Sequence, residues 1–126
     1  MKIAGALFDV ATAARDFRLP ELYCGFDRSE RTSVVAYPVA CIPQAWAAAT
    51  PFLLLQAMLG ISPDAPARAL RIERPTLPDW LGQIRLHGLR VGNATVTLAF
   101  ERDGAVTAFA LLGQAGNISV TMAAGE

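Results

Sequence analysis

The stretch that decides the fold of the second half of the chain is Thr95-Val96-Thr97-Leu98-Ala99-Phe100. Large apolar side chains occupy every second position, which is the pattern of a β-strand with one buried and one exposed face. The next residues, Arg102-Asp103-Gly104, are typical of a tight turn, and a second apolar run begins at Val106. The sequence therefore predicts a β-hairpin here.

The same period of two recurs on both sides of this hairpin. It is present at Leu70 and Ile72, and again at Ile84 and Leu86, with charged residues between each pair. A second hairpin turn is predicted at residues 114–117, before a last strand that begins at Ile118. Residues 67–126 are therefore expected to form a small antiparallel β module of about four or five strands.

Residues 1–61 lack this alternation and are expected to be helical, apart from a loop in residues 17–39. The first helical pattern has apolar side chains at the spacing of a helix face, at Ile3, Leu7, Val10 and Ala14. The expected fold class is therefore α+β, with N-terminal helices in residues 1–61 followed by the β module in residues 67–126.

A second helix is predicted to begin near Pro43 and to stop at Gly60, because proline suits a first helical turn and glycine a helix end. This helix is apolar on nearly every face, which is typical of buried helices. Pro51 lies inside it and is expected to kink or divide it. Residues 62–66 are rich in proline and are predicted to be a linker.

Composition limits the class of partner. The 126 residues carry 11 basic and 11 acidic side chains, so the formal net charge is zero and nucleic-acid binding is not expected. The chain is 53% hydrophobic and only 17% charged, which is apolar for its size. We therefore expect some apolar surface to be covered by a missing part of a larger enzyme or by a second copy of the chain.

The sequence favours a cytoplasmic protein without a membrane span. The most apolar run, residues 45–59, is interrupted and shorter than the about 20 apolar residues that a helix needs to cross a bilayer. Cys24 and Cys41 are expected to be reduced, buried thiols. No metal or cofactor is expected, because His87 has no neighbouring ligand at metal-site spacing.

Two motif segments in the first half combine a carboxylate with apolar and aromatic residues. They are Leu19-Pro20-Glu21-Leu22-Tyr23-Cys24-Gly25-Phe26 and Tyr37-Pro38-Val39-Ala40-Cys41-Ile42-Pro43-Gln44-Ala45-Trp46. A charge is rarely placed among such neighbours unless chemistry or a buried partner requires it. Glu21 is thus a candidate catalytic residue. Alternatively, it holds a loop by accepting backbone N–H bonds or by pairing with Arg18 or Arg28.

Aromatic residues of these motif segments are candidates for sugar binding. Tyr23, Tyr37 and Trp46 could stack on apolar sugar faces, while Gln44 could bind hydroxyl groups. Core packing is the alternative for Trp46, and the preferred interpretation for Phe26.

The two motif segments resemble the C-terminal end of the amylo-α-1,6-glucosidase, or glycogen debranching enzyme, family. The likeness continues through residues 52–56 and 74–81 and covers most of the chain. Enzymes of this family are similar to glucoamylases and trehalases in having an (α/α)₆ barrel, with the catalytic acid and base on different loops. The resemblance implies that residues 1–61 are the last helices of such a barrel and that the substrate is an α-glucan or a small α-glucoside.

The resemblance also implies that Glu21 is the general base of an inverting hydrolysis. Such enzymes need two carboxyl groups roughly 6.5–9.5 Å apart, one protonated and one ionised. No segment of this chain matches the general acid of the family. Asp27 and Glu30 stand among arginines, which would keep them ionised and unsuited to that role. Hydrolysis by this chain alone is therefore not expected.

Three hypotheses follow. The preferred one is the C-terminal portion of a debranching-type hydrolase, which contributes Glu21 to a catalytic site completed elsewhere. The second is a non-catalytic glucan-binding module. The third is a self-associating interaction domain, in which a second copy covers the apolar helices and Glu21 has no functional role.

Overall fold

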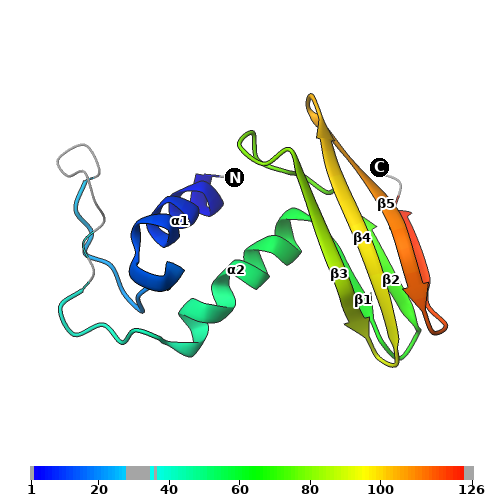
Figure 1. The fold of residues 1–126 in the computed structure, drawn as a ribbon, viewed down its shortest axis with the longest axis horizontal. Helices are drawn as coiled ribbons and strands as arrows, with labels where there is room; N and C mark the ends of the chain where they lie inside the picture. The colour runs from blue at the N-terminus through cyan, green and yellow to red at the C-terminus, as the bar shows by residue number, and fades with distance from the viewer. Residues whose placement is uncertain (1, 28–34, 36, 124–126) are drawn as a thin grey trace. The chain divides into compact units, whose positions relative to one another are not determined.

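The computed structural model describes residues 2–27, 35 and 37–123, and its fold is α+β. Within this described part, two α-helices are followed by two three-stranded sheets, one mixed and one antiparallel (Figure 1). The chain separates into two compact units, Met1–Leu54 (unit 1) and Leu55–Glu126 (unit 2). The α+β class expected from the sequence is confirmed.

Unit 1 begins with helices that bury little of their apolar surface. Helix α1 spans Lys2–Ala13 and contains no buried residue, and Ile3 is 69% exposed. A short 3-10 helix, η1, follows at Arg15–Phe17, where Asp16 has a φ of 58°. Because short helices gain most of their stability from tertiary packing, α1 depends on whatever covers its apolar side chains.

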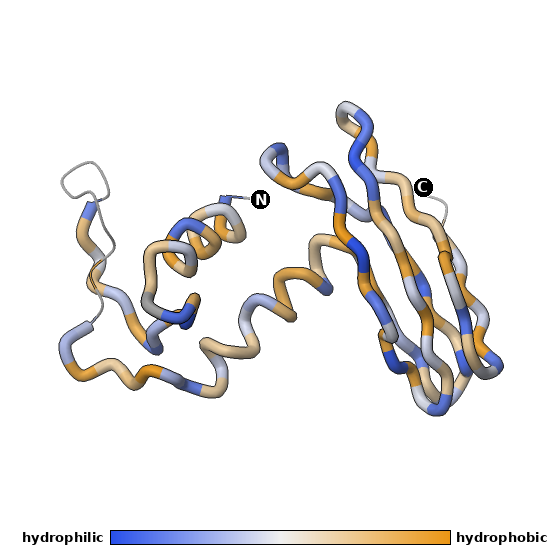
Figure 2. The backbone as a smooth tube through the Cα atoms, in the orientation of Figure 1, coloured by the Kyte–Doolittle hydropathy of each residue, from blue (hydrophilic) through white to orange (hydrophobic). Residues whose placement is uncertain are grey.

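Helix α2 spans Ala45–Met58 and corrects two expectations. It continues through Pro51 as one helix, so the predicted division is wrong. A proline removes a single backbone donor, and hydrogen bonds on either side of it can persist. Ala47 is the one buried residue of α2, so the helix is not buried, although Figure 2 shows hydrophobic residues along its length. The described chain does not supply enough partners to cover a helix that is apolar on every face.

The first sheet has the order β1-β2-β6 and consists of β1 (Ile61–Asp64), β2 (Ala69–Glu73) and β6 (Ser119–Ala123). Strand β1 lies antiparallel to β2, whereas β6 lies parallel to it. The predicted linker at residues 62–66 is therefore wrong for the residues that form β1. The expectation of a wholly antiparallel module is corrected by the β2–β6 pair.

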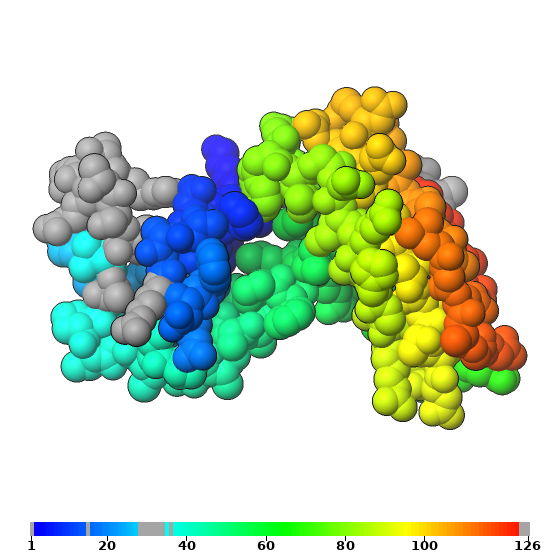
Figure 3. All heavy atoms as spheres, in the orientation of Figure 1, coloured from blue at the N-terminus to red at the C-terminus, as the bar shows by residue number. Residues whose placement is uncertain are grey.

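The second sheet has the order β3-β4-β5 and consists of β3 (Gln83–Val91), β4 (Ala94–Asp103) and β5 (Val106–Ala115). All of its pairs are antiparallel, and Asp103 lies opposite Val106 across a two-residue turn. The predicted hairpin is thus confirmed. Figure 3 shows the residues of this sheet as one continuous face, from β3 (yellow-green) through β4 (yellow) to β5 (orange).

The turn after β5 does not form the second hairpin that the sequence predicts. Strand β5 pairs with β4, but β6 pairs with β2 in the other sheet. The chain crosses between the sheets at Ile118, which is 5% exposed and belongs to the core. Strand β2 has β1 on one side only, so its other edge is available for β6, and pairing there satisfies backbone groups on both strands.

Unit 2 has a hydrophobic core to which strands of both sheets contribute. Its largest fully buried side chains are Phe100, Leu59, Leu70, Ile72, Leu98 and Val96. The rings of Phe100 and Phe109 lie 6.1 Å apart between centroids, at an interplanar angle of 33°. Full burial of one such side chain contributes about 1.5–3 kcal/mol, so this core is the main stabilising contribution within unit 2.

A buried hydrogen bond ties residues 74–81 to β5, and its loss should destabilise unit 2. The backbone N–H of Leu77 donates to the Thr107 hydroxyl at 3.0 Å, and both residues are buried. We expect Thr107→Val to lower the free energy of unfolding by about 1–3 kcal/mol, because the N–H loses its partner. Urea unfolding measures this. Thr107→Ser should cost less, and the exposed Thr121→Val is the matched control; equal effects of the two valine variants would contradict the prediction.

Gly60 should tolerate no side chain. Its φ is +61°, and a Cβ there would lie 1.8 Å from the carbonyl oxygen of Glu73. Gly104 has a similar φ of +59° but no heavy atom within 4 Å of the same position. Gly104→Ala should cost about 1–2 kcal/mol through its left-handed conformation alone. Gly60→Ala should cost clearly more in the same unfolding experiment, and equal costs would show that the close approach to Glu73 is unimportant.

Candidate functional site

The two motif segments lie side by side in unit 1. The backbone N–H of Cys24 donates to the carbonyl of Val35 at 2.8 Å. The backbone N–H of Tyr37 donates to the carbonyl of Leu22 at 3.1 Å. The chain therefore doubles back on itself, and it brings the segment that contains Glu21 against the segment that leads into α2.

Glu21 and Cys41 close this doubled chain with two reciprocal hydrogen bonds. The backbone N–H of Glu21 donates to the carbonyl of Cys41 at 3.2 Å. The backbone N–H of Cys41 donates to Oε2 of Glu21 at 3.0 Å. The structure thus shows the loop-holding role considered for Glu21, in which its carboxylate accepts a backbone N–H. Arg28, one of the two arginines considered as a partner, lies outside the described residues, as does Glu30.

The hydrogen bonds at Glu21 keep its carboxylate ionised. The backbone N–H of Cys41 is the largest cause that lowers the pKa of Glu21 below its ordinary value. Partial burial opposes this shift, and hydrogen bonds from the side chains of Cys41 and Gln44 add to it. Because the residue is only half-buried, water reaches it. An ionised, water-accessible carboxylate is the form that a general base requires.

Cys41 is the residue that the sequence analysis did not assign to the site. Its side chain is exposed, so the expectation of a buried thiol is wrong for Cys41. A hydrogen bond to Glu21 and the negative charge of that carboxylate raise the pKa of the Cys41 thiol. The thiol therefore stays protonated at neutral pH and is a poor nucleophile. No spacing rule in a single sequence signals a contact across twenty residues, and this is why Cys41 was missed.

Gln44 lies at the start of α2, where its side chain has a defined partner. Its Oε1 accepts the backbone N–H of Ala45 at 2.9 Å, which satisfies one of the free donors of the helix N-terminus. The Gln44 side chain is also the smallest of the causes that lower the pKa of Glu21. Gln44 therefore belongs to the Glu21 cluster, which comprises Glu21, Cys41 and Gln44.

Three of the four aromatic candidates are exposed, and the fourth is half-buried. Tyr37 is 48% exposed and Trp46 is 61% exposed, so core packing of Trp46 is excluded. Phe26 is 53% exposed, and the preferred interpretation of it as a core residue is wrong. Tyr23 is half-buried, and its hydroxyl has no hydrogen-bond partner among the described residues; burial raises the pKa of Tyr23. In that part of the chain no ring contact joins the two tyrosines and Trp46 into one wall.

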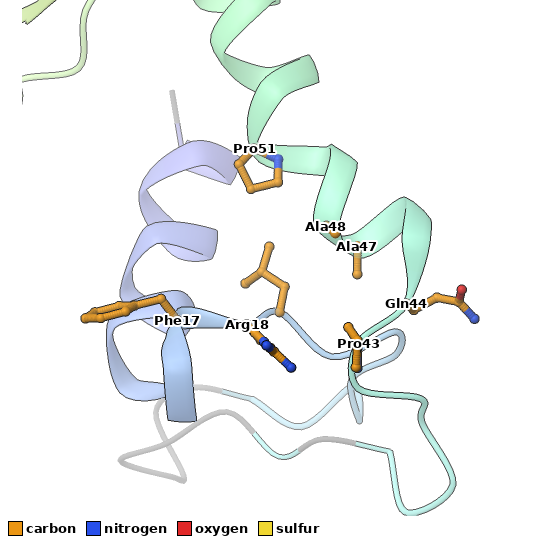
Figure 4. A pocket seen from close by; sticks show the side chains of 8 residues that line it. Phe17, Arg18, Pro43, Gln44, Ala47, Ala48 and Pro51 are labelled. Carbon is orange, nitrogen blue, oxygen red and sulfur yellow. The ribbon is translucent and has the colours of Figure 1, made fainter.

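A pocket of about 350 Å³ lies in unit 1 beside the Glu21 cluster. It is lined by Phe17, Arg18, Leu19, Pro43, Gln44, Ala47, Ala48 and Pro51 (Figure 4). Gln44 is the one predicted site residue in this lining, and Figure 4 shows its amide turned away from the other side chains. The pocket is mainly apolar and does not contain the carboxylate of Glu21.

The described residues contain neither a metal-binding cluster nor a membrane-spanning helix. No group of histidine, cysteine, aspartate and glutamate residues there is arranged to hold a metal ion, and His87 is an exposed residue of β3. None of the helices in residues 2–27 and 37–123 is both long and apolar enough to cross a membrane.

The Cys41 amide should report the titration of Glu21. The lowered pKa of Glu21 means that its stabilising effect is present above the ordinary carboxyl range and is lost as pH falls through the folded-state value. We expect the ¹⁵N shift of Cys41 to titrate below the ordinary pKa of glutamate. This titration should vanish in Glu21→Gln and persist in the control Glu73→Gln, an exposed residue of β2. A Cys41 shift that titrates equally in both variants would contradict the assigned contact.

Comparison of the chain with protein-family models, with curated protein sequences and with solved structures finds no match. The resemblance carried by the two motif segments therefore stays a prediction, and function has to be argued from the residues themselves.

Proposed function

We propose that the chain is the C-terminal portion of an inverting α-glucoside hydrolase of the glycogen-debranching type. In this proposal unit 1 supplies the last helices of an (α/α)₆ barrel, and Glu21 is the general base. The observation that carries the proposal is the state of Glu21, an ionised and water-accessible carboxylate held by the Cys41 backbone. It lies where the two motif segments that carry the resemblance meet.

The surface of unit 1 supports a role inside a larger helical body. Most of the exposed large apolar side chains of the described residues belong to this unit: Ile3, Phe8, Phe17, Leu22, Phe26, Tyr37, Val39, Ile42, Trp46, Phe52 and Leu53. An exposed apolar surface of this extent is typical of an interaction site. Further barrel helices would cover α1 and α2 in the way that neighbouring helices cover one another in a barrel.

The chemistry assigned to Glu21 is proton abstraction from water. In an inverting hydrolysis the base activates a water molecule on one face of the sugar, while an acid on the other face protonates the leaving oxygen. The general acid would come from the missing barrel segment. Because hydrogen bonds lower the pKa of Glu21, the base would remain ionised under mildly acidic conditions. Loss of activity at low pH should therefore begin below the ordinary carboxyl range.

The exposed aromatic rings are assigned to the α-glucan. Tyr37 and Trp46 present their rings to solvent, and such rings pack well against the apolar faces of sugars. The Tyr23 hydroxyl has no hydrogen-bond partner among the described residues but is itself buried, so a sugar hydroxyl would reach it only after a local rearrangement of the chain. These residues, with Gln44, would bind substrate next to the base.

A second candidate, a glucan-binding module without catalysis, is favoured by one observation. Glu21 already has a structural role in closing the doubled chain through Cys41, and that role needs no reaction. In this case the exposed rings of Tyr37 and Trp46 would bind glucan, and the chain would need no general acid. A self-associating domain is the third possibility, in which a second copy covers the apolar helices.

Reconstitution tests the proposed function. The full chain is combined with the barrel portion of a debranching-type hydrolase that lacks its own C-terminal portion, and glucose release from an α-1,6-linked glucoside is measured. We expect activity only when both parts are present, and a loss of about 10²–10⁴-fold in Glu21→Gln. Glu73→Gln should retain full activity. Glutamine keeps an oxygen for the Cys41 N–H, so the loop should stay in place.

Other outcomes identify the competing functions. A complex that forms but releases no glucose would reject the catalytic role. Glycogen binding by the chain alone, lost in Trp46→Ala without any hydrolysis in the complex, would support the binding module. A dimeric mass in solution that dissociates when Phe52 is changed to serine would support self-association.

A further inference from the structure

We propose that the outer edge of strand β5, over residues 106–111, is a dimerisation surface on which the same segment of a second copy of the chain pairs antiparallel. We call this segment the β5 edge. It lies in unit 2, whereas Glu21 and the exposed apolar helices lie in unit 1. The proposal therefore goes beyond the proposed function and does not depend on it.

The β5 edge presents backbone groups that have no partner strand. Strand β5 pairs with β4 on one side, and no described strand pairs with its other side (Figure 1). Asp103 and Val106 close a two-residue turn, and the closing residues of such a turn form a hydrogen-bonded pair. The alternation of an antiparallel ladder then directs the N–H and C=O groups of Thr107, Phe109 and Leu111 away from β4. A row of such groups is a template for another strand.

The other edges of the two sheets carry features that discourage strand pairing. Strand β3, at the opposite edge of the same sheet, carries Arg85 and Arg90. Strand β1 has four residues and contains Pro63, which lacks a backbone donor, and β6 has only five residues. Charged side chains, prolines and short strands are the usual means by which proteins protect a sheet edge.

Strand β5 lacks most of this protection. It has ten residues, none of them charged and none of them proline. Its one irregularity is at Leu112, because Leu111 lies opposite Leu98 and Gly113 lies opposite Thr97, which leaves Leu112 opposite no residue of β4. A bulge of this kind bends a strand and interrupts pairing. The proposed surface therefore ends at residue 111.

A second copy of the chain fits the β5 edge because the segment is complementary to itself. Two antiparallel copies are related by a two-fold axis, so each presents the same uncharged residues to the other. The formal net charge of the chain is zero, so the two copies do not repel each other through net charge. A pair of β3 strands would instead bring Arg85 and Arg90 of both copies together, which is unfavourable.

Pairing through β5 also gives an assembly that closes. The two sheets would join into one sheet with three strands from each copy, and its outer edges would both be the arginine-bearing β3. Val106, which is 66% exposed, and Leu111, which is 43% exposed, would gain cover from the added strand. Six residues from each copy make a small interface, so we expect a weak dimer that depends on concentration.

Sedimentation equilibrium of the full chain tests the proposal. We expect the mass to rise from 13.4 kDa toward twice that value between micromolar and millimolar chain concentration. The double variant Ala108→Lys with Ala110→Lys, at exposed positions of β5, should weaken the dimer by about tenfold or more, because like charges meet across the new strand pair. The double variant Gln83→Lys with His87→Lys is the matched control, since it adds lysines at exposed positions of β3 and should leave the dimer unchanged.

Three results would overturn the proposal. The first is a chain that stays monomeric at every concentration. The second is a dimer that persists in the folded β5 lysine variant but dissociates in Phe52→Ser, which would place the contact on the helices of unit 1. The third is growth beyond a dimer, which would show that the contact does not close.

Amide hydrogen exchange locates the contact in the dimer. We expect the amides of Thr107, Phe109 and Leu111 to exchange several-fold more slowly at high than at low chain concentration, because the second copy accepts their hydrogen bonds. The amides of β3 should not depend on concentration. A dimer in which these three amides exchange at the same rate as in the monomer would overturn the pairing of β5 even if the masses agree with it.

Discussion

The hydrogen bond from the Cys41 N–H to the Glu21 carboxylate is the constraint on which the arrangement of unit 1 depends. It joins residues twenty positions apart in a unit where few side chains are buried, so burial contributes little to holding them together. The same contact lies three residues before Gln44 and the start of α2, and it therefore also sets where that helix begins relative to the doubled chain. A charged acceptor makes such a bond stronger than one between neutral groups.

The two units are stabilised in different ways. In unit 2 the alternating side chains of β2 and β4 meet in one core, and Leu70, Leu98 and Phe100 are fully buried. Unit 1 has local hydrogen bonds and helices, but most of its large apolar side chains are exposed. Hydrophobic burial is the main favourable contribution to folding, so unit 1 gains much more stability from a covering partner than unit 2 does. This asymmetry is what a segment that completes a larger body would show.

The sequence predicted those elements whose pattern is local. The period of two in β4 and the turn after Asp103 are properties of neighbouring residues, and both were confirmed. The parallel pairing of β6 with β2 was missed, because it joins residues about fifty positions apart and no turn residue specifies it. The register between β3 and β4 shifts between Leu86 and Leu89. His87 and Gly88 are therefore both exposed, and the alternation of apolar residues in β3 resumes at Leu89.

For the site, too, the sequence signalled a local feature and missed a contact between distant residues. The sequence singled out Glu21 because a carboxylate among apolar neighbours is unusual, and Glu21 does have specific partners in the structure. It did not reveal that Cys41 is the main partner, since a backbone N–H carries no sequence signal. Exposure was misjudged for Phe26 and for the whole of α2, because hydropathy measures the preference of a side chain for burial and not whether the described chain can satisfy that preference.

A structural role for Glu21 does not conflict with a role as a base. A carboxylate has two oxygens with about four acceptor positions, and the Cys41 N–H uses one of them at Oε2. Hydrogen bonds that lower the pKa weaken the carboxylate as a base, but they also keep it ionised and restrict its orientation. Orientation matters for a base that must face one side of a sugar ring, since misplacing a reacting group by about 1 Å can cost roughly 10²-fold in rate. In the proposed hydrolase, a glutamate held by the loop that it stabilises would therefore gain a fixed orientation and lose part of its basicity.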